Sequence, residues 1–171
     1  MKTGALVPVE EYLRTTYDPD CDYVDGEVLE RNLGERDHSK LQKKLILFFG
    51  NREKTWNIVV FPEQRVQVSP TRFRVPDICV YAGEEPQEQI FRTPPFICIE
   101  ILSPEDRWER MQKKIDDYLR FGVPHVWVIN PREQRAWAYT KDGSAEVQDG
   151  VLRTENPSLA VPLTEIFEQA Q

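Results

Sequence analysis

The sequence lacks any apolar run approaching the roughly 20 residues that a membrane-spanning helix requires. It also lacks the N-terminal pattern of a basic segment followed by a hydrophobic one that marks a secretory signal. These absences argue against a membrane-embedded or secreted protein. We therefore expect a cytoplasmic protein with no membrane partner.

Cysteine is scarce, and its spacing does not suit a zinc or redox motif. The three cysteines, Cys21, Cys79 and Cys98, form no CxxC pair, and two of them lie inside apolar stretches. This pattern favours buried thiols in a reducing compartment over disulfides or zinc ligands. No internal repeat, glycine-rich phosphate loop or GxSxG elbow occurs in the chain.

An excess of basic residues is missing as well. The chain has 22 Lys and Arg against 29 Asp and Glu, for a net charge of -7. This charge argues against a protein that coats nucleic acid through bulk electrostatics, although a local basic patch beside an acidic metal site remains compatible with it. With 171 residues, 40 % of them hydrophobic, the chain is expected to fold as one domain over residues 1–171.

The most informative feature is a pair of apolar stretches, residues 74–81 and 96–104, that each contain one carboxylate. Asp77 lies in the first and Glu100 in the second, and both faces of each stretch are mostly apolar, which predicts two central strands. A carboxylate in such a strand costs several kcal/mol of desolvation unless it meets a metal, a cation or hydrogen-bond donors. Because the strands could be neighbours, we expect the two carboxylates to share a site.

The rest of the chain alternates short strands and helices. An initial proline with early acids predicts a helix over residues 8–16, Asp25-Gly26 predicts a type I′ hairpin, and apolar spacing predicts a helix from residue 35 to Gly50. Residues 82–94 are expected to form a solvated loop and are a candidate flap. Further predicted elements are strands at 57–69 and 125–131, a hairpin with arms at 134–140 and 145–152, and a short helix over 163–168.

A helix is predicted to follow the Glu100 strand directly, with Ser103 as its N-cap and Pro104 at its first position. Together with the strand at 125–131 it would form a parallel βαβ crossover. At about 100° per residue, Lys114 projects to the border of the apolar stripe and Lys113 to the solvated side. The stripe comprises Trp108, Met111, Ile115, Tyr118 and Leu119, and its border near Lys114 is flanked by Arg107 and Arg110, which could form a local basic patch.

Two residues outside these stretches are further candidates for the site. His38 projects to the same side of its predicted helix as Leu41 and Leu45. It is either a satisfied interior histidine or a site histidine that touches substrate phosphate or a metal-bound water. Glu27 leaves the predicted hairpin turn on the second strand.

These residue types suit a divalent-metal site that cuts phosphodiester bonds. Such hydrolysis needs a cation to offset charge on the phosphoryl oxygens, a lowered pKa for the attacking water and a group that orients this water. Asp77 and Glu100 can hold Mg²⁺ or Mn²⁺ through oxygen, with the backbone carbonyl of Ile101 as a further ligand. Lys114 would stabilise the transition state or position the water.

Several motifs also occur in an order that a known family shares. They are Pro76-Asp77, the run from Glu100 to Pro104, Lys114 four residues before Tyr118, Gly122-Val123-Pro124 and the run from Trp127 to Pro131, with Asp25-Gly26-Glu27 and His38 as further matches. In these motifs the chain resembles the Uma2 family, a former domain of unknown function that is grouped with the PD-(D/E)XK nuclease-like fold. The resemblance covers roughly residues 8–170.

The resemblance implies an α/β fold of the restriction-endonuclease-like type, in which helices flank a mixed central sheet. It implies a metal-dependent endonuclease that acts on nucleic acid, with DNA favoured. The standard nuclease motif places a lysine two residues after the glutamate, where this chain has Leu102. In the family this lysine lies on the next helix, at the position of Lys114. The site residues that follow are Asp77, Glu100 and Lys114, supported by Glu27 and His38.

Two other interpretations stay open. The chain could be a nuclease-fold module without turnover that binds nucleic acid or a protein partner. Alternatively, Asp77 and Glu100 could be a structural pair, neutralised by Lys114 and arginines, in an interaction protein. A homodimer would suit a small nuclease that cuts both strands of a duplex, but no stretch of the sequence demands one.

Overall fold

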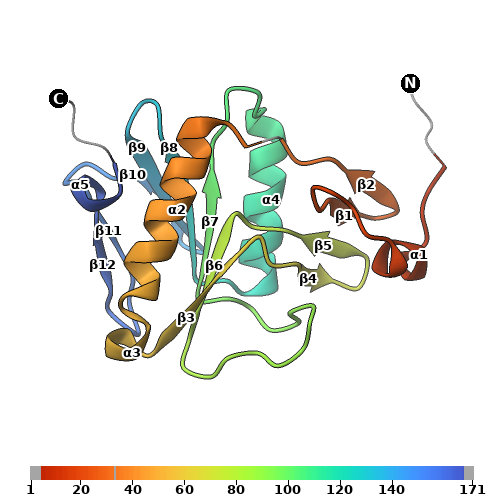
Figure 1. Ribbon diagram of the computed structural model, residues 1–171, viewed down its shortest axis with the longest axis horizontal. Helices are drawn as coiled ribbons and strands as arrows, with labels where there is room; N and C mark the ends of the chain where they lie inside the picture. Colours follow the sequence, from red (N-terminus) through yellow and green to blue (C-terminus); the bar gives the residue numbers. More distant parts are fainter. Residues whose placement is uncertain (1–4, 33, 168–171) are drawn as a thin grey trace.

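A six-stranded mixed sheet forms the centre of the computed structural model, which describes residues 5–32 and 34–167. Within this sheet β7 and β8 pair in parallel, and the other neighbouring strands pair antiparallel. Helices cover both faces of the sheet (Figure 1), so the predicted fold class is confirmed. In spatial order the strands are β10 (Gly143–Glu146), β9 (Arg135–Thr140), β8 (His125–Asn130), β7 (Ile97–Ile101), β6 (Ile78–Ala82) and β3 (Ile58–Pro62).

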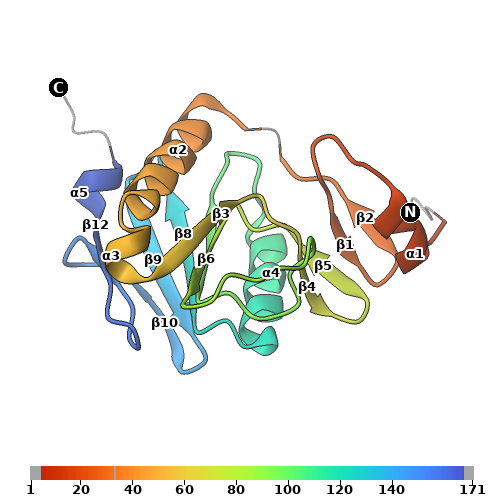
Figure 2. The same cartoon turned by 60° about the horizontal axis from the view of Figure 1, so that its bottom comes forward.

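Two long helices, α2 (Arg36–Gly50) and α4 (Trp108–Phe121), pack on opposite faces of this sheet (Figures 1 and 2). On one face Leu45 of α2 belongs to the same buried cluster as Ile99 of β7. On the other face Ile115 of α4 belongs to a cluster that contains Cys98. Successive β7 side chains therefore enter different cores, as the two-residue alternation predicted.

The order β7, α4, β8 is the predicted βαβ crossover, and the parallel pairing of the two strands confirms it. The predicted start of the helix is wrong, because α4 begins at Trp108 rather than at Pro104. The Asp106 carboxylate accepts hydrogen bonds from the Ser103 N–H at 2.6 Å and from the Ser103 hydroxyl at 3.1 Å. These bonds build a turn ahead of the helix. Trp108, predicted to lie in the core, is 58 % exposed on the first turn.

The predicted strand over residues 74–81 is also wrong, because the chain breaks at Pro76. Its first part is β5 (Arg72–Arg74) in a second sheet, and its last part is β6 in the central sheet. Proline has no N–H to donate and disfavours regular pairing, while the N–H of Val75 donates to the Asp22 carboxylate at 2.9 Å. Asp77 therefore lies just before β6 and not inside a strand.

The second sheet lies beside α4, at the right of Figure 1. Asp25 and Gly26 have φ angles of 50° and 99°, which confirms the hairpin, since a type I′ turn needs positive φ at both central residues. Tyr12 stacks on Tyr23 beneath this sheet, with ring centroids 4.8 Å apart. The elements are β2 (Glu27–Leu29), β1 (Asp22–Val24), β5 and β4 (Val66–Ser69), with the helix α1 (Val9–Arg14).

The C-terminal part forms a separate two-stranded sheet of β11 (Val151–Arg153) and β12 (Ala160–Pro162). The predicted hairpin is half right, since β9 pairs with β10 whereas β11 pairs with β12. The helix predicted over 163–168 corresponds to α5 (Leu163–Ile166), and residue 168 lies outside the described residues. The remaining helix, α3 (Glu53–Trp56), follows α2.

All three cysteines are free and buried, as predicted. Among the helices of the described residues, none combines the length and the apolar character needed to cross a lipid bilayer.

Candidate active site

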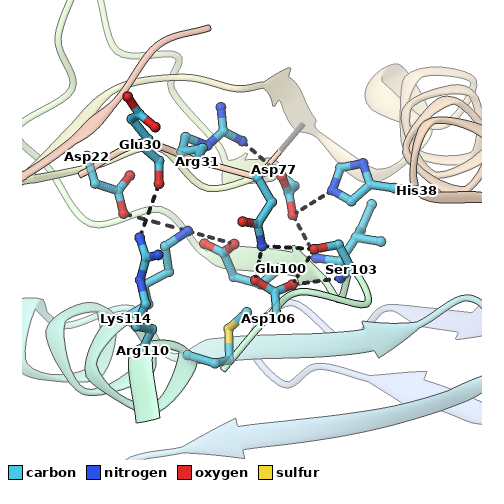
Figure 3. A pocket seen from close by; sticks show the side chains of 13 residues that line it. Asp22, Glu30, Arg31, His38, Asp77, Glu100, Ser103, Asp106, Arg110 and Lys114 are labelled. Atoms are coloured by element: carbon cyan, nitrogen blue, oxygen red, sulfur yellow. Dashed lines mark hydrogen bonds and ion pairs between the residues drawn. The ribbon is translucent and has the colours of Figure 1, made fainter. Parts of the chain in front are cut away.

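A cavity lies where the residue before β6, the end of β7 and the first half of α4 face the segment that follows β2 (Figure 3). Its volume open to water is about 50 Å³, room for a few water molecules, because one water needs about 10–15 Å³ by this measure. The cavity brings together five of the residues predicted from the sequence: Asp77, Glu100, Ile101, Lys114 and His38.

Asp77 is held by donors on both carboxylate oxygens. Its Oδ1 accepts a hydrogen bond from Nη2 of Arg31 at 2.9 Å. Its Oδ2 accepts one from the N–H of Ile101 at 2.7 Å and lies 3.3 Å from Nε2 of His38. Burial alone would raise the pKa of Asp77, but the His38 hydrogen bond and the charges of His38, Lys114 and Arg31 together lower it. Asp77 is therefore a carboxylate at neutral pH.

Glu100 has a different environment. Its Oε2 accepts a hydrogen bond from Nζ of Lys114 at 3.1 Å, and its Oε1 accepts one from the hydroxyl of Tyr118 at 2.6 Å. Burial, reinforced by the negative charges of Asp77 and Asp22, raises the pKa of Glu100 to about 7 against the opposing effect of Lys114 and Tyr118. The two carboxylates thus differ in charge near neutral pH, and a further cation would favour ionisation of Glu100.

Lys114 reaches the cavity from α4 and lies between two carboxylates. Besides Glu100, its Nζ lies 3.6 Å from Oδ2 of Asp22. Although burial would lower the pKa of Lys114, the charges of Asp22, Glu100 and Asp77 raise it, so the side chain stays an ammonium. The helix projection placed Lys114 at the border of the apolar stripe, and in the structure it faces the cavity.

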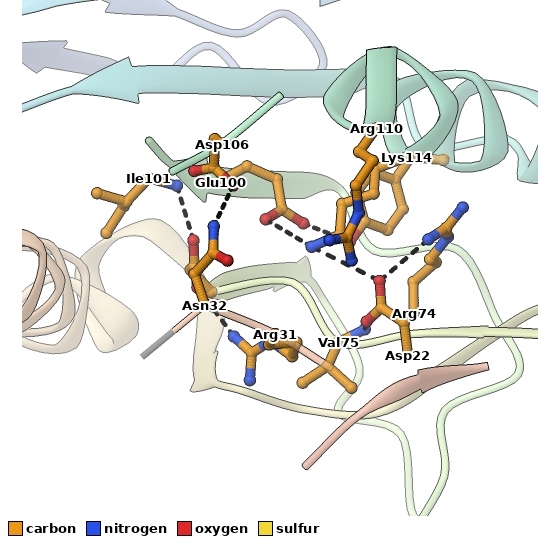
Figure 4. A network of polar contacts seen from close by, with 12 residues as sticks. Asp22, Arg31, Asn32, Arg74, Val75, Glu100, Ile101, Asp106, Arg110 and Lys114 are labelled. Atoms are coloured by element: carbon orange, nitrogen blue, oxygen red, sulfur yellow. Dashed lines mark hydrogen bonds and ion pairs between the residues drawn. The ribbon is translucent and has the colours of Figure 1, made fainter. Parts of the chain in front are cut away.

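A buried ion-pair network connects this lysine with the second sheet (Figure 4). Asp22 accepts a hydrogen bond from Nη1 of Arg74 at 3.0 Å. Arg74 also donates through Nε to Asp117 at 2.8 Å. Asp117 also accepts a hydrogen bond from Arg72 at 2.7 Å. The position of Lys114 is therefore fixed from both sides, by β7 through Glu100 and by β1 through Asp22.

The segment Glu30 to Asn32, which follows β2, crosses the cavity in Figure 3. The carbonyl of Glu30 accepts a hydrogen bond from Arg110 at 3.1 Å. Asn32 donates to the hydroxyl of Ser103 at 2.9 Å and to Asp106 at 2.7 Å. We call residues 30–32 the bridging segment, because these bonds attach it to the far wall of the cavity.

Not every predicted residue lies at the cavity. Glu27 is exposed at the start of β2 and does not line the cavity. Its role in the site stays a prediction, and its position in the structure does not support that role. Lys113 pairs with Glu109 on the solvated side of α4, as expected. Of the two arginines expected to form a basic patch, Arg110 lines the cavity and Arg107 does not.

The sequence reasoning missed Arg31, Asn32, Asp22 and Tyr118. Arg31 and Asn32 stand in a polar segment between a strand and a helix, and no periodicity there predicts where a side chain points. Asp22 had a usable signal, since it is a carboxylate in a strand-forming run beside Tyr23 and Val24. Tyr118 was assigned to the core, where its ring is buried, but its hydroxyl reaches Glu100.

The residues at the cavity fit a weakly held, hydrated cation. Asp77, Glu100 and Ile101 line one cavity, and Mg²⁺ is typically bound by one or two carboxylates while it keeps several waters. Within residues 5–32 and 34–167, no group of three or more His, Cys, Asp and Glu side chains is arranged to hold a metal ion. A cage of the type that binds Zn²⁺ is therefore absent from this part of the chain.

Comparison with known proteins identifies a family and related solved structures. The model of the Uma2 family, described as "Putative restriction endonuclease", matches residues 9–168. A crystal structure from Anabaena variabilis ATCC 29413, described as a "putative nuclease belonging to DUF820", matches with a TM-score of 0.80 and 24 % sequence identity, covering 94 % of this chain and 97 % of that chain. At this identity the likeness concerns the fold. No curated protein matches the chain.

Proposed function

This chain belongs to the Uma2 family, and from that premise we propose that it is a metal-dependent endonuclease that hydrolyses phosphodiester bonds in nucleic acid, DNA first of all. One observation carries the proposal: Asp77 and Glu100 line the same cavity, and Lys114 donates a hydrogen bond to Glu100. Two carboxylates can hold the cation that metal-assisted phosphodiester hydrolysis uses, and a lysine can stabilise the negative charge that develops on the phosphoryl oxygens.

Asp77, Glu100 and the carbonyl of Ile101 would hold Mg²⁺ or Mn²⁺. When bound, the cation supplies positive charge for the phosphoryl oxygens and lowers the pKa of water. His38 fixes the orientation of Asp77 through its 3.3 Å contact with Oδ2. Lys114, a permanent ammonium at the wall of the cavity, stabilises negative charge that develops on the phosphoryl group.

A basic groove beside the cavity supports nucleic acid as the substrate. This groove has a volume of about 280 Å³ and is lined by Lys40, Lys44 and Arg132, together with Asp37. A narrow depression bordered by His38 and Arg132 lies between the groove and the cavity. In a chain with a net charge of -7, such a local concentration of cations suits a sugar-phosphate backbone.

A nuclease-fold module without turnover is the second candidate. It is favoured by the ion pairs already present, because Arg31 neutralises Asp77 and Lys114 neutralises Glu100. A site of this kind needs no metal to be electrostatically satisfied. The module would use the cations of the cavity and the groove to bind nucleic acid or a protein partner.

Nicking of a supercoiled plasmid with Mg²⁺, with Mn²⁺ and with EDTA tests the proposal. The endonuclease predicts metal-dependent nicking by the wild type, loss of nicking in Asp77→Ala and Lys114→Ala, and retention in Lys113→Ala. Absence of nicking by the wild type in either metal, with oligonucleotide binding intact, would favour the inactive module. A homodimer, which would present two cavities to a duplex, is tested by the mass of the protein in solution.

A further inference from the structure

Arg31 donates a hydrogen bond to Oδ1 of Asp77, the carboxylate oxygen that has a single donor among the described residues. Oδ2 already receives the N–H of Ile101 at 2.7 Å and faces His38 at 3.3 Å. Oδ1 receives only Nη2 of Arg31 among the described residues, at 2.9 Å. A cation that enters the cavity would therefore bind Asp77 through Oδ1, and the guanidinium stands at that atom (Figure 3).

We propose that Arg31 is a further catalytic residue, which neutralises Asp77 in the metal-free protein and moves onto a phosphate of the nucleic acid when a divalent cation binds. The inference rests on the proposed endonuclease function and deepens it. It assigns Arg31, for which the sequence motifs gave no role, to direct contact with the substrate.

The surroundings of Arg31 allow its side chain to move while its backbone stays. The guanidinium has one strong contact, to Asp77, and one weak contact, to Glu63 at 3.7 Å. The Arg31 side chain is 10 % exposed and that of Glu63 is 53 % exposed, so the arginine lies at the boundary between the cavity and solvent. On both sides of Arg31 the bridging segment is attached, through Glu30 to Arg110 and through Asn32 to Ser103 and Asp106.

The charges around the cavity favour the movement of the Arg31 guanidinium from Asp77 to a phosphate of the nucleic acid. The buried acids Asp22, Asp77, Glu100 and Asp117 are paired with four cations, which are Arg31, Lys114, Arg74 and Arg72. With all four acids ionised this set is neutral, so a divalent cation alone would leave two positive charges in excess. A phosphodiester brings negative charge, and a guanidinium binds phosphate through two parallel hydrogen bonds. Metal and phosphate should therefore strengthen each other's binding.

Two binding measurements on the variant Arg31→Met test this inference without reference to turnover. The first is Mn²⁺ affinity of the protein alone, by electron paramagnetic resonance or calorimetry. The second is the Mn²⁺-dependent affinity for a fluorescently labelled oligonucleotide duplex. We expect Arg31→Met to bind Mn²⁺ about 10-fold more tightly, because a competing cation is removed, and to bind the duplex about 10-fold more weakly.

Arg110→Met is the matched control. It removes the same charge from the same cavity, but Arg110 donates to the backbone carbonyl of Glu30 and not to a carboxylate. We expect it to change Mn²⁺ affinity by no more than about 2-fold. Arg31→Lys keeps the positive charge but loses the planar guanidinium that can donate two parallel hydrogen bonds to a phosphate. It should therefore retain the Mn²⁺ affinity of the wild type and lose part of the duplex affinity. It also supplies a test if Arg31→Met does not fold.

The outcomes separate this inference from the proposed function. If Arg31→Met binds Mn²⁺ more tightly and the duplex more weakly than the wild type, the inference about Arg31 is supported. Failure of the wild type to nick plasmid would contradict the proposed endonuclease function and would leave this result on Arg31 standing. The inference is overturned if Arg31→Met binds Mn²⁺ no more tightly than Arg110→Met. It is equally overturned if duplex affinity is unchanged, or if Arg31→Lys binds duplex as well as the wild type.

Discussion

The carboxylate of Asp77 accepts a hydrogen bond from the backbone N–H of Ile101 at 2.7 Å. This bond connects the residue before β6 with Ile101, the last residue of β7, which follows Glu100 (Figure 4). The two acids are therefore placed relative to each other by the backbone of the sheet and do not depend on a metal to bring them together. Preorganisation of this kind reduces the free-energy cost of binding a cation. Because Asp77 and Glu100 have different hydrogen-bond partners, we expect their substitutions to change stability in different directions.

Asp77→Asn should destabilise the protein. Asp77 has a lowered pKa and accepts hydrogen bonds from Arg31 and Ile101, so the amide leaves the buried guanidinium without its counter-charge. We expect the free energy of unfolding to fall by about 2–4 kcal/mol, as for other buried ion pairs that lose one partner. Urea denaturation measures this change. A loss below about 0.5 kcal/mol would mean that the ion pair with Arg31 is not formed in solution.

Glu100→Gln should have the opposite effect. The pKa of Glu100 is about 7, raised from its ordinary 4.5, so between these values the native state holds more protons than the unfolded state. Linkage then requires the free energy of unfolding to fall as pH rises through this window. Glutamine carries no charge and avoids this loss. We expect the variant to be more stable than the wild type by about 2 kcal/mol at pH 8, with the difference shrinking toward pH 5.

The comparison with Glu109→Gln isolates the effect of burial at Glu100. Glu109 is on the same helix face as its partner Lys113, in a solvent-exposed pair at 3.3 Å. Its replacement should change stability by less than about 0.5 kcal/mol at any pH. If the free energy of unfolding depended on pH in the same way for the wild type and Glu100→Gln, Glu100 would titrate as an ordinary surface acid.

The strands and the long helices could be predicted because their signals are local and repeated. The alternation of Ile97, Cys98 and Ile99 specified which residue faces which core, and the spacing around Ile115 specified the inner side of α4. The two errors at element ends have local causes that the pattern does not reveal. Pro76 divides one apparent strand between two sheets, and Asp106 builds a turn where a helix cap was expected.

The candidate site could be predicted only where a polar residue interrupts an apolar pattern. Asp77, Glu100 and Lys114 stand out for this reason, since each occurs in or beside an apolar stripe. Arg31 lies in a polar segment, so nothing local indicates that it meets Asp77, 46 positions away in the chain. Such a contact depends on how the second sheet packs on α4, through the pairs that join Arg74 to Asp22 and Asp117.

Lys114→Met should strongly reduce the rate of plasmid nicking. Methionine keeps much of the stem of the side chain within α4 but removes the ammonium that donates to Glu100. Removal of one charge-stabilising donor typically lowers turnover about 10²–10³-fold, and we expect a loss of that size in plasmid nicking. Lys113→Met, which exchanges the same group on the solvated side, should retain the wild-type rate. Equal rates in the two variants would remove Lys114 from the catalytic set.

Charge reversal in the basic groove should weaken the binding of nucleic acid. Lys44 on α2 and Arg132 at the turn between β8 and β9 line this groove. We expect Lys44→Glu and Arg132→Glu each to lower the affinity for a labelled duplex about 10-fold and to reduce the slope of log K against log salt by about 1. Fluorescence anisotropy at several salt concentrations measures both quantities. Lys141→Glu makes the same change at the opposite end of β9 and should leave affinity and slope near those of the wild type. If all three variants lost affinity equally, the effect would reflect net charge, and the groove would not be the path of the sugar-phosphate backbone.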